Sequence, residues 1–249
     1  MHVLLVQTAA DLDSAVNRAR LAELTPDGAA DLVVFPEAFA RDFGRPGSSV
    51  AAFAEPIDGP FASEVERLAA ARGTTIVAGM FESSTDPERP FNTVIVRGRA
   101  RADYRKIHLF DSFGFRESDQ LSPGPLEPVS VELEGLTVGL LTCYDLRFPE
   151  LARALAADVL VVPAAWIAGH LKVDQWFTLA RARAIENVCY VVAVGQCGPR
   201  YAGHSVVIDP LGEVIAQAGD GEVVVPAHLD PEVLRRARET NPSLANRRL

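Results

Sequence analysis

Short runs of β-branched and other apolar residues alternate with stretches of helical spacing along the whole chain. Apolar or alternating runs predict strands over residues 3–8, 32–35, 74–80, 91–97, 101–105, 136–142, 159–162, 190–194, 204–208, 214–217 and 222–225. Amphipathic spacing predicts helices over residues 12–24, 61–72, 150–156, 173–188 and 232–239. Strands outnumber helices, and the order mixes β-α-β units with hairpins. The pattern therefore predicts an α/β protein in which helices cover the faces of mixed sheets.

Glycine and proline mark several of the predicted boundaries. Gly73 follows the helix at residues 61–72 as a C-terminal stop, and Pro149 stands where the next helix takes its first turn. Residues 111–128 are rich in Ser, Pro, Gly and Asp, which predicts a long loop. The Gly/Ser-rich stretch at residues 42–49 is too brief to separate domains. We therefore predict a single domain for the whole chain of 249 residues.

The composition narrows the classes of function. Hydrophobic residues make up 48% of the chain and charged residues 23%, and the formal net charge is −9. This acidic balance argues against a nucleic-acid or anionic-membrane binder, because both of those partners need a basic face. The start of the chain lacks a secretory-signal pattern, and the longest apolar stretches are too short to span a bilayer. We expect a cytoplasmic protein that acts on a small molecule.

The cysteine and histidine content argues against structural crosslinks and metal centres. Three cysteines without paired spacing predict no disulfide framework. The sequence has no Cys/His cluster with zinc-ligand spacing and no glycine-rich phosphate-binding loop. We therefore expect neither a metal nor an organic cofactor.

Cys143 is the candidate nucleophile. An apolar strand ends just before it, one turn follows, and a helix begins at Pro149. A nucleophile at such a turn is exposed at the sheet edge, where the following backbone N–H groups point at a developing oxyanion. Because the thiolate is the reactive form, a base or a cation must lie nearby. A buried structural cysteine is the alternative, and we prefer it for Cys189; Cys197 is expected to occupy an ordinary loop position.

Three charged residues adjoin apolar segments in a way that suits a catalytic site. Glu37 follows a buried strand and a proline, and strand C-terminal ends are where α/β proteins form their sites. Its aromatic neighbours would desolvate it and favour a role as general base. Lys106 follows a strand and stays cationic beside a carboxylate, where it would stabilise a thiolate and an oxyanion. Glu117 is a second acid, in the long loop. Taken alone, each of the three is better explained as an ordinary surface charge.

Together these segments resemble the three catalytic blocks of the nitrilase superfamily, in the right order. The blocks are Phe-Pro-Glu-Ala around Glu37, Tyr-Arg-Lys-Ile-His-Leu-Phe around Lys106, and Cys-Tyr-Asp-Leu-Arg-Phe-Pro-Glu-Leu from Cys143. The resemblance covers nearly the whole chain and extends to residues 181–187 and 203–213. It implies a Glu37–Lys106–Cys143 triad, with Glu117 as an accessory fourth member. It also implies the four-layer α-β-β-α sandwich of these hydrolases, a homodimer or higher homo-oligomer, and a reaction without cofactor.

The block that begins at Cys143 looks closest to the branch holding ω-amidase and deaminated-glutathione amidase. Those enzymes hydrolyse the amide of small α-keto acid amides, which implies a thioester route that releases ammonia. Residues 163–170 and the loop from Lys106 to Glu117 depart from that branch. N-carbamoyl amino acids and aliphatic amides therefore stay open as substrates. Nitriles are less favoured, because the relatives in this branch are amidases.

Two other classes of function stay open. The first is a non-catalytic binding or assembly module, against which the intact Glu, Lys and Cys argue. The second is a papain-like hydrolase that pairs the cysteine with His108, His170 or His204. It predicts that loss of a histidine abolishes turnover while loss of Lys106 is mild, and the nitrilase resemblance predicts the reverse.

Residues near the nucleophile are candidates for binding the substrate. The N–H of Tyr144 is placed to bind the oxyanion, and Arg147 is placed either to hold a substrate carboxylate bidentately or to form a structural salt bridge. Trp166 is a candidate for the pocket wall. Trp176, on a helix, and His108, at a strand end, are expected to be packed residues.

Overall fold

Two six-stranded mixed sheets form the centre of the structure, a computed structural model that describes residues 1–28 and 30–248. In spatial order, the first sheet contains β14 (Val223–His228), β1 (His2–Gln7), β2 (Leu32–Val34), β3 (Thr75–Glu82), β4 (Phe91–Arg97) and β5 (Ala102–Arg105). The second contains β13 (Val214–Gln217), β12 (Val206–Ile208), β11 (Tyr190–Gly195), β10 (Val159–Ala164), β9 (Leu136–Leu140) and β8 (Ser130–Leu133). Each sheet has three parallel strands at its centre, flanked by antiparallel partners.

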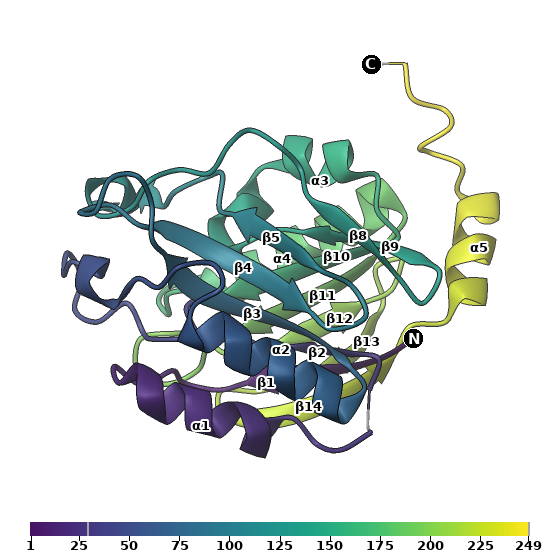
Figure 1. Cartoon of the computed structure of the whole chain (residues 1–249). Helices are drawn as coiled ribbons and strands as arrows, with labels where there is room; N and C mark the ends of the chain where they lie inside the picture. Colours follow the sequence, from purple (N-terminus) through teal and green to yellow (C-terminus); the bar gives the residue numbers. More distant parts are fainter. Residues whose placement is uncertain (29, 249) are drawn as a thin grey trace.

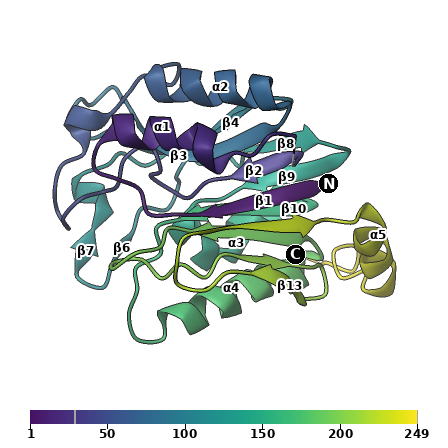
Figure 2. The same ribbon diagram turned by 90° about the horizontal axis from the view of Figure 1, so that it is seen from below.

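Helices cover the outer face of each sheet, so the chain forms a four-layer α-β-β-α sandwich (Figure 1). The helices are α1 (Ser14–Leu24), α2 (Pro60–Arg72), α3 (Pro149–Leu155), α4 (Lys172–Asn187) and α5 (Pro231–Thr240). Figure 2 shows α1 and α2 on one side of the two sheets and α3 and α4 on the other, with α5 beyond one end of the layers. No helix in the described part of the chain is long and apolar enough to cross a membrane.

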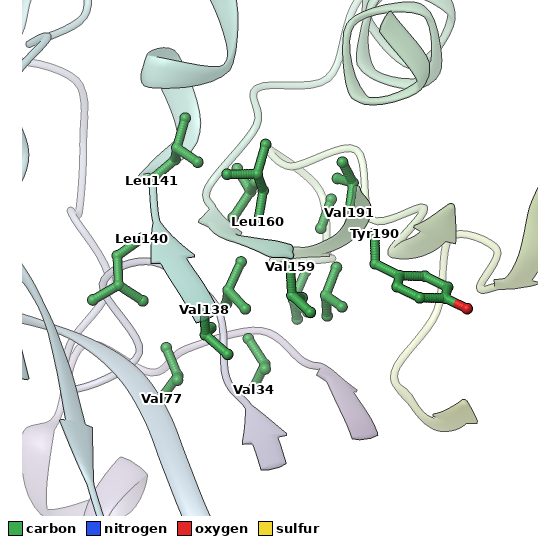
Figure 3. Packing of buried hydrophobic residues seen from close by; sticks show 14 of the residues in the cluster. Val34, Val77, Val138, Leu140, Leu141, Val159, Leu160, Tyr190 and Val191 are labelled. Carbon is green, nitrogen blue, oxygen red and sulfur yellow. The ribbon is translucent and has the colours of Figure 1, made fainter. Parts of the chain in front are cut away.

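The main core lies between the facing sheets. Val34 and Val77 from the first sheet point toward Val138 of the second, and all three side chains are at most 1% exposed (Figure 3). Burying a valine or leucine side chain contributes about 1.5–3 kcal/mol. The central parallel strands are covered on both faces, by the other sheet and by helices, which explains their near-continuous apolar sequences.

The sequence predicted the helices and most strands close to their observed bounds. Asp13 caps α1, with its side chain accepting from the Ala15 N–H, so this helix begins at Ser14. Gly73 ends α2 in the left-handed conformation (φ 63°), as expected. The strand predicted at residues 136–142 is shorter, because the backbone turns into a 3-10 helix at Cys143–Arg147.

Two features departed from the sequence-based expectation. The edge strand β8 was missed, because its four residues offer little periodicity and it is recognised by its pairing with β9. The loop expected over residues 111–128 contains a small hairpin of β6 (Asp111–Ser112) and β7 (Phe115–Arg116), followed by a 3-10 turn.

Candidate active site

The candidate residues meet at one end of the two sheets. Glu37 follows β2, Lys106 follows β5, and Cys143 follows β9. They line a cavity of about 570 Å³ together with Glu117. The other three candidates, Tyr144, Arg147 and Trp166, line the same cavity. Glu37 and Trp166, 129 positions apart in the sequence, share this cavity. They do so because parallel strands end at the same edge of a sheet.

The turn that carries Glu37 is packed directly on β3. Ala38 adopts a left-handed backbone conformation with φ 53°. The N–H of Ala40 donates to the Gly79 carbonyl at 2.9 Å, and the Gly79 N–H donates to the Pro36 carbonyl at 3.2 Å. A Cβ at position 79 would lie 2.4 Å from the Ala38 nitrogen, so the close approach requires glycine there.

Gly79→Ala is expected to displace the Glu37 turn. The atoms nearest to the added methyl group all belong to the backbone of Glu37 and Ala38 and cannot rotate away. We therefore expect a loss of about 1–3 kcal/mol in the free energy of unfolding, as in overpacked cores. Urea denaturation measures the loss, and amide turnover should fall with it. Gly221→Ala is the matched control, since its Cβ would meet nothing within 4 Å. Equal stability of both variants would show that the turn is not held by this contact.

Lys106 lies between two buried carboxylates. Its Nζ donates to Glu37 Oε1 at 2.9 Å and to Glu117 Oε2 at 2.8 Å. All three side chains are at most 4% exposed. Glu37 Oε2 also accepts from the Ala165 N–H at 2.6 Å, and Glu117 Oε2 accepts from the Phe110 N–H at 2.6 Å. The two acids are thus fixed by backbone donors as well as by the shared ammonium.

Asn92 is a site residue that the sequence analysis missed. Its Nδ2 donates to Glu37 Oε1 at 2.7 Å and to Glu117 Oε1 at 3.2 Å, so it bridges the two acids. It lies in β4 and is 1% exposed. An asparagine inside a strand was the available signal, because such a residue is disfavoured there unless its amide is used.

Cys143 lies on a strained turn. Its φ is 47°, an unfavourable left-handed conformation for a residue with a side chain. Asp145 holds the turn: its Oδ2 accepts from the Thr142 N–H at 2.9 Å and from the Tyr104 hydroxyl at 2.7 Å, and its Oδ1 interacts with His108 Nδ1 at 2.7 Å. This fully buried carboxylate, also missed from sequence, joins the nucleophile turn to the strand end that carries Lys106.

The electrostatics of the resting site favour a thiol at Cys143. Burial raises the pKa of this thiol well above its usual value, and the negative charge of Glu37 adds to the rise; the Lys106 ammonium opposes it with a smaller effect. Burial alone would lower the pKa of Lys106, but the carboxylates of Glu117 and Glu37 raise it well above its usual value. The Lys106 ammonium thus lowers the thiol pKa, as expected, but burial and Glu37 raise that pKa by more.

A thiolate signal from Cys143 is expected only at high pH. The raised pKa means that the sulfur binds its proton below the usual thiol value of 9.0 and releases it above that value. The difference in absorbance near 240 nm between the wild type and Cys143→Ala should therefore stay flat through neutral pH and rise only above about pH 9. Subtraction removes the contributions of Cys189 and Cys197. A step below pH 8 would contradict this prediction.

The remaining candidate residues form the cavity wall. Arg147 lies 5.0 Å from the Trp166 ring centroid, and its Nη2 donates to Gln175 Oε1 at 2.7 Å. Trp176 is fully buried against Trp166, as expected for a packed residue. The structure shows no salt bridge from Arg147 to an acid among residues 1–28 and 30–248, which removes the structural alternative as far as those residues go.

The histidines of the papain-like alternative lie outside this cavity. His108 stacks on Phe148 with ring centroids 3.7 Å apart and bonds to Asp145, which confirms its packed role. His204 pairs with Asp220 at 2.8 Å. His170 is exposed. None of the three is among the described residues that line the cavity with Cys143.

Comparison with known proteins identifies the family of the chain. A profile of the carbon-nitrogen hydrolase family matches residues 5–239. A deaminated glutathione amidase of Escherichia coli O157:H7 is 41% identical over 223 residues, which cover 87% of this chain and 84% of that protein. A CN-hydrolase superfamily structure from Xanthomonas campestris with an arsenic adduct in its active site has a TM-score of 0.90 at 31% identity, covering 100% of this chain and 97% of that one.

An amidase of Nesterenkonia sp. AN1, in which acrylamide has added to the active-site cysteine, has a TM-score of 0.77 at 28% identity and covers 96% of this chain and 97% of that one. The family profile spans nearly all of the chain, and its relatives share the sandwich fold as well as the sequence. The chain is thus a hydrolase that acts on amides. It belongs to the carbon-nitrogen hydrolase family of the nitrilase superfamily.

Proposed function

We propose that this hydrolase cleaves the C–N bond of a small linear carboxamide through a thioester on Cys143 and releases ammonia. The observation that carries the proposal is the buried Lys106 ammonium held between Glu37 and Glu117 in the cavity that Cys143 also lines. This arrangement supplies a base, a nucleophile and a fixed positive charge within one pocket. A cavity of about 570 Å³ suits a small molecule.

In the first half-reaction, Glu37 accepts the Cys143 proton as the sulfur attacks the amide carbon. The carbonyl oxygen becomes an oxyanion, which the Lys106 ammonium and the Tyr144 N–H stabilise. Glu37 then passes its proton to the leaving nitrogen, the C–N bond breaks, and ammonia departs. The raised pKa of Lys106 supports this role, because the amine keeps its positive charge throughout.

In the second half-reaction, water attacks the thioester carbon. Glu37 or Glu117 takes a proton from the water, a second oxyanion forms on the same donors, and the Cys143 sulfur leaves with a proton returned to it. The products are a carboxylic acid and the free enzyme. Dividing the reaction at the thioester replaces one difficult displacement with two easier ones.

The relatives and the cavity together support one substrate class. Deaminated glutathione amidase is the name of the E. coli relative, and it supports a substrate similar to those of ω-amidase or deaminated-glutathione amidase. N-carbamoyl amino acids and aliphatic amides are the alternatives within the same chemistry.

An ammonia-release screen tests the proposal. Purified protein would be incubated with α-ketoglutaramate, deaminated glutathione, N-carbamoyl amino acids, aliphatic amides and matched nitriles, with Cys143→Ala protein as the blank. We expect release from at least one amide by the wild type alone, with an acyl-enzyme detected by intact mass after a rapid quench. Release by the blank at the wild-type rate, or release from nitriles and no amide, would overturn the proposal.

A further inference from the structure

The backbone of Glu37 is held from the second sheet by a buried glutamine. Gln196 follows β11 and is 1% exposed. Its Nε2 donates to the Glu37 carbonyl at 2.9 Å, and its Oε1 accepts from the Ala10 N–H at 3.0 Å. Only one orientation of the amide satisfies both partners, since one of them is an acceptor and the other a donor. The side chain therefore links the Glu37 turn, the segment after β1 and the second sheet.

The backbone of Gln196 is itself fixed among strand ends. Its N–H donates to the Ala164 carbonyl at 2.8 Å, and its carbonyl accepts from the Gly203 N–H at 3.0 Å. Ala164 ends β10, and the next residue, Ala165, donates its N–H to Glu37 Oε2 at 2.6 Å. Two neighbouring strand ends of the second sheet thus hold the same residue of the first sheet, one through its carbonyl and the other through its carboxylate.

The first sheet holds Glu37 through a separate set of contacts. The carboxylate accepts from Lys106 and Asn92, and the turn that carries it is bonded to Gly79 of β3. Cys143, by contrast, follows β9 in the second sheet. The base and the nucleophile therefore belong to different sheets, and their separation depends on how the two sheets are joined at this end.

We propose that Gln196 is a positioning residue for the reaction, because it ties the Glu37 turn to the second sheet and so keeps the carboxylate within reach of the Cys143 sulfur. The inference rests on the proposed role of Glu37 as the base that accepts the Cys143 proton. Gln196 is not among the described residues that line the cavity, so it acts through Glu37 and not on the substrate. Proton transfer needs a fixed donor–acceptor distance, and a displacement of about 1 Å can cost about 100-fold in rate.

The electrostatics of Cys143 agree with a carboxylate held close to the sulfur. Burial raises the pKa of this thiol most, followed by the charge of Glu37; Lys106 lowers it, and a hydrogen bond to Glu37 and the charge of Glu117 raise it further. A released Glu37 turn would withdraw with the first sheet, and the contribution of its carboxylate would shrink. Loss of Gln196 should then lower the pKa of the thiol, which a titration detects without any substrate.

The first test replaces Gln196 by methionine, which has a similar shape but can make neither hydrogen bond. With the best amide from the ammonia-release screen, we expect Gln196→Met to lower kcat about 10- to 100-fold and to change KM by less than about threefold. Gln7→Met is the matched control. Gln7 is also 1% exposed and joins β1 to Ser205, Gly219 and Gly221, none of which is among the described residues of the cavity wall. Both variants should lower the urea midpoint, but only the first should lose kcat.

The second test follows the thiolate absorbance of Cys143, as the difference between each protein and the same protein carrying Cys143→Ala. In Gln196→Met the thiolate should appear at lower pH than in the wild type, and in Gln7→Met at the wild-type pH. If Gln196→Met does not fold, Gln196→Asn gives the same comparison, because its shorter side chain cannot reach both partners.

An unchanged kcat or an unchanged thiol titration in the Gln196 variant would overturn the positioning role. An equal fall of kcat in Gln196→Met and Gln7→Met would also overturn it, because Gln196 would then only stabilise the fold. A wild-type protein that releases no ammonia from any amide would refute the proposed function instead. In that case the thiol titration, which needs no substrate, still decides whether Gln196 positions Glu37.

Discussion

Lys106→Met is expected to abolish measurable turnover and to lower the free energy of unfolding by about 3–5 kcal/mol. The substitution keeps most of the side-chain volume but removes the ammonium that Glu37 and Glu117 share. Two buried carboxylates then face each other without a cation, and removing one member of a buried ion pair typically costs that much. The oxyanion also loses a charged donor, worth about 100- to 1,000-fold in rate. Urea denaturation and ammonia release measure the two effects.

Arg101→Met provides the matched control for this variant. Arg101 is an exposed cation just before β5, the strand that Lys106 follows, and it pairs with the half-exposed Glu66. Its loss should lower the free energy of unfolding by no more than about 1 kcal/mol. His170→Asn and His204→Asn should leave turnover within a few-fold of wild type, because neither histidine lines the cavity. An active Lys106→Met protein beside an inactive histidine variant would favour the papain-like alternative instead.

Glu37→Gln is expected to lower kcat by about 1,000-fold, within the usual range for loss of a general base. The amide is nearly the same shape but accepts no proton from Cys143, whose raised pKa leaves the sulfur protonated near neutral pH. In either orientation of the glutamine amide, its NH₂ would also face another donor, since Lys106 donates to one carboxylate oxygen of Glu37 and the Ala165 N–H to the other. Rapid-quench mass spectrometry should detect no acyl-enzyme.

Glu117→Gln separates the two glutamates. If Glu117 acts mainly on the water that attacks the thioester, this variant should form the acyl-enzyme and hydrolyse it slowly, so the covalent species accumulates. Glu127→Gln, at an exposed loop position, controls for the loss of one negative charge. A Glu37→Gln protein that accumulates acyl-enzyme at the wild-type rate would show that another group activates the sulfur.

The sequence pointed to the three candidate catalytic residues but not to the residues that hold them in place. Glu37, Lys106 and Cys143 each stand beside a strand end in a recognisable string, so local pattern and resemblance found them. Asn92 and Asp145 act through partners 25 to 55 and 37 to 41 positions away, which no local pattern reveals. Their roles became clear only when both sheets were in place.

The missed strand β8 shows the same limit at the level of fold. The four residues of β8 offer only a short alternation of polar and apolar side chains, so they are identified as a strand by their pairing with β9. The protonation of Cys143 also depended on burial, which the sequence does not give.

The antiparallel pairing of β1 with β14 means that the first sheet is completed by a strand from the far end of the sequence. The first sheet contains five strands from the first 105 residues, yet its remaining strand spans Val223–His228. One flank of β1 therefore stays unpaired until residues 223–228 reach it. Such long-range closure slows folding and prolongs exposure of an unpaired edge. Until β14 pairs with it, β1 is an open edge onto which a strand of another molecule could add.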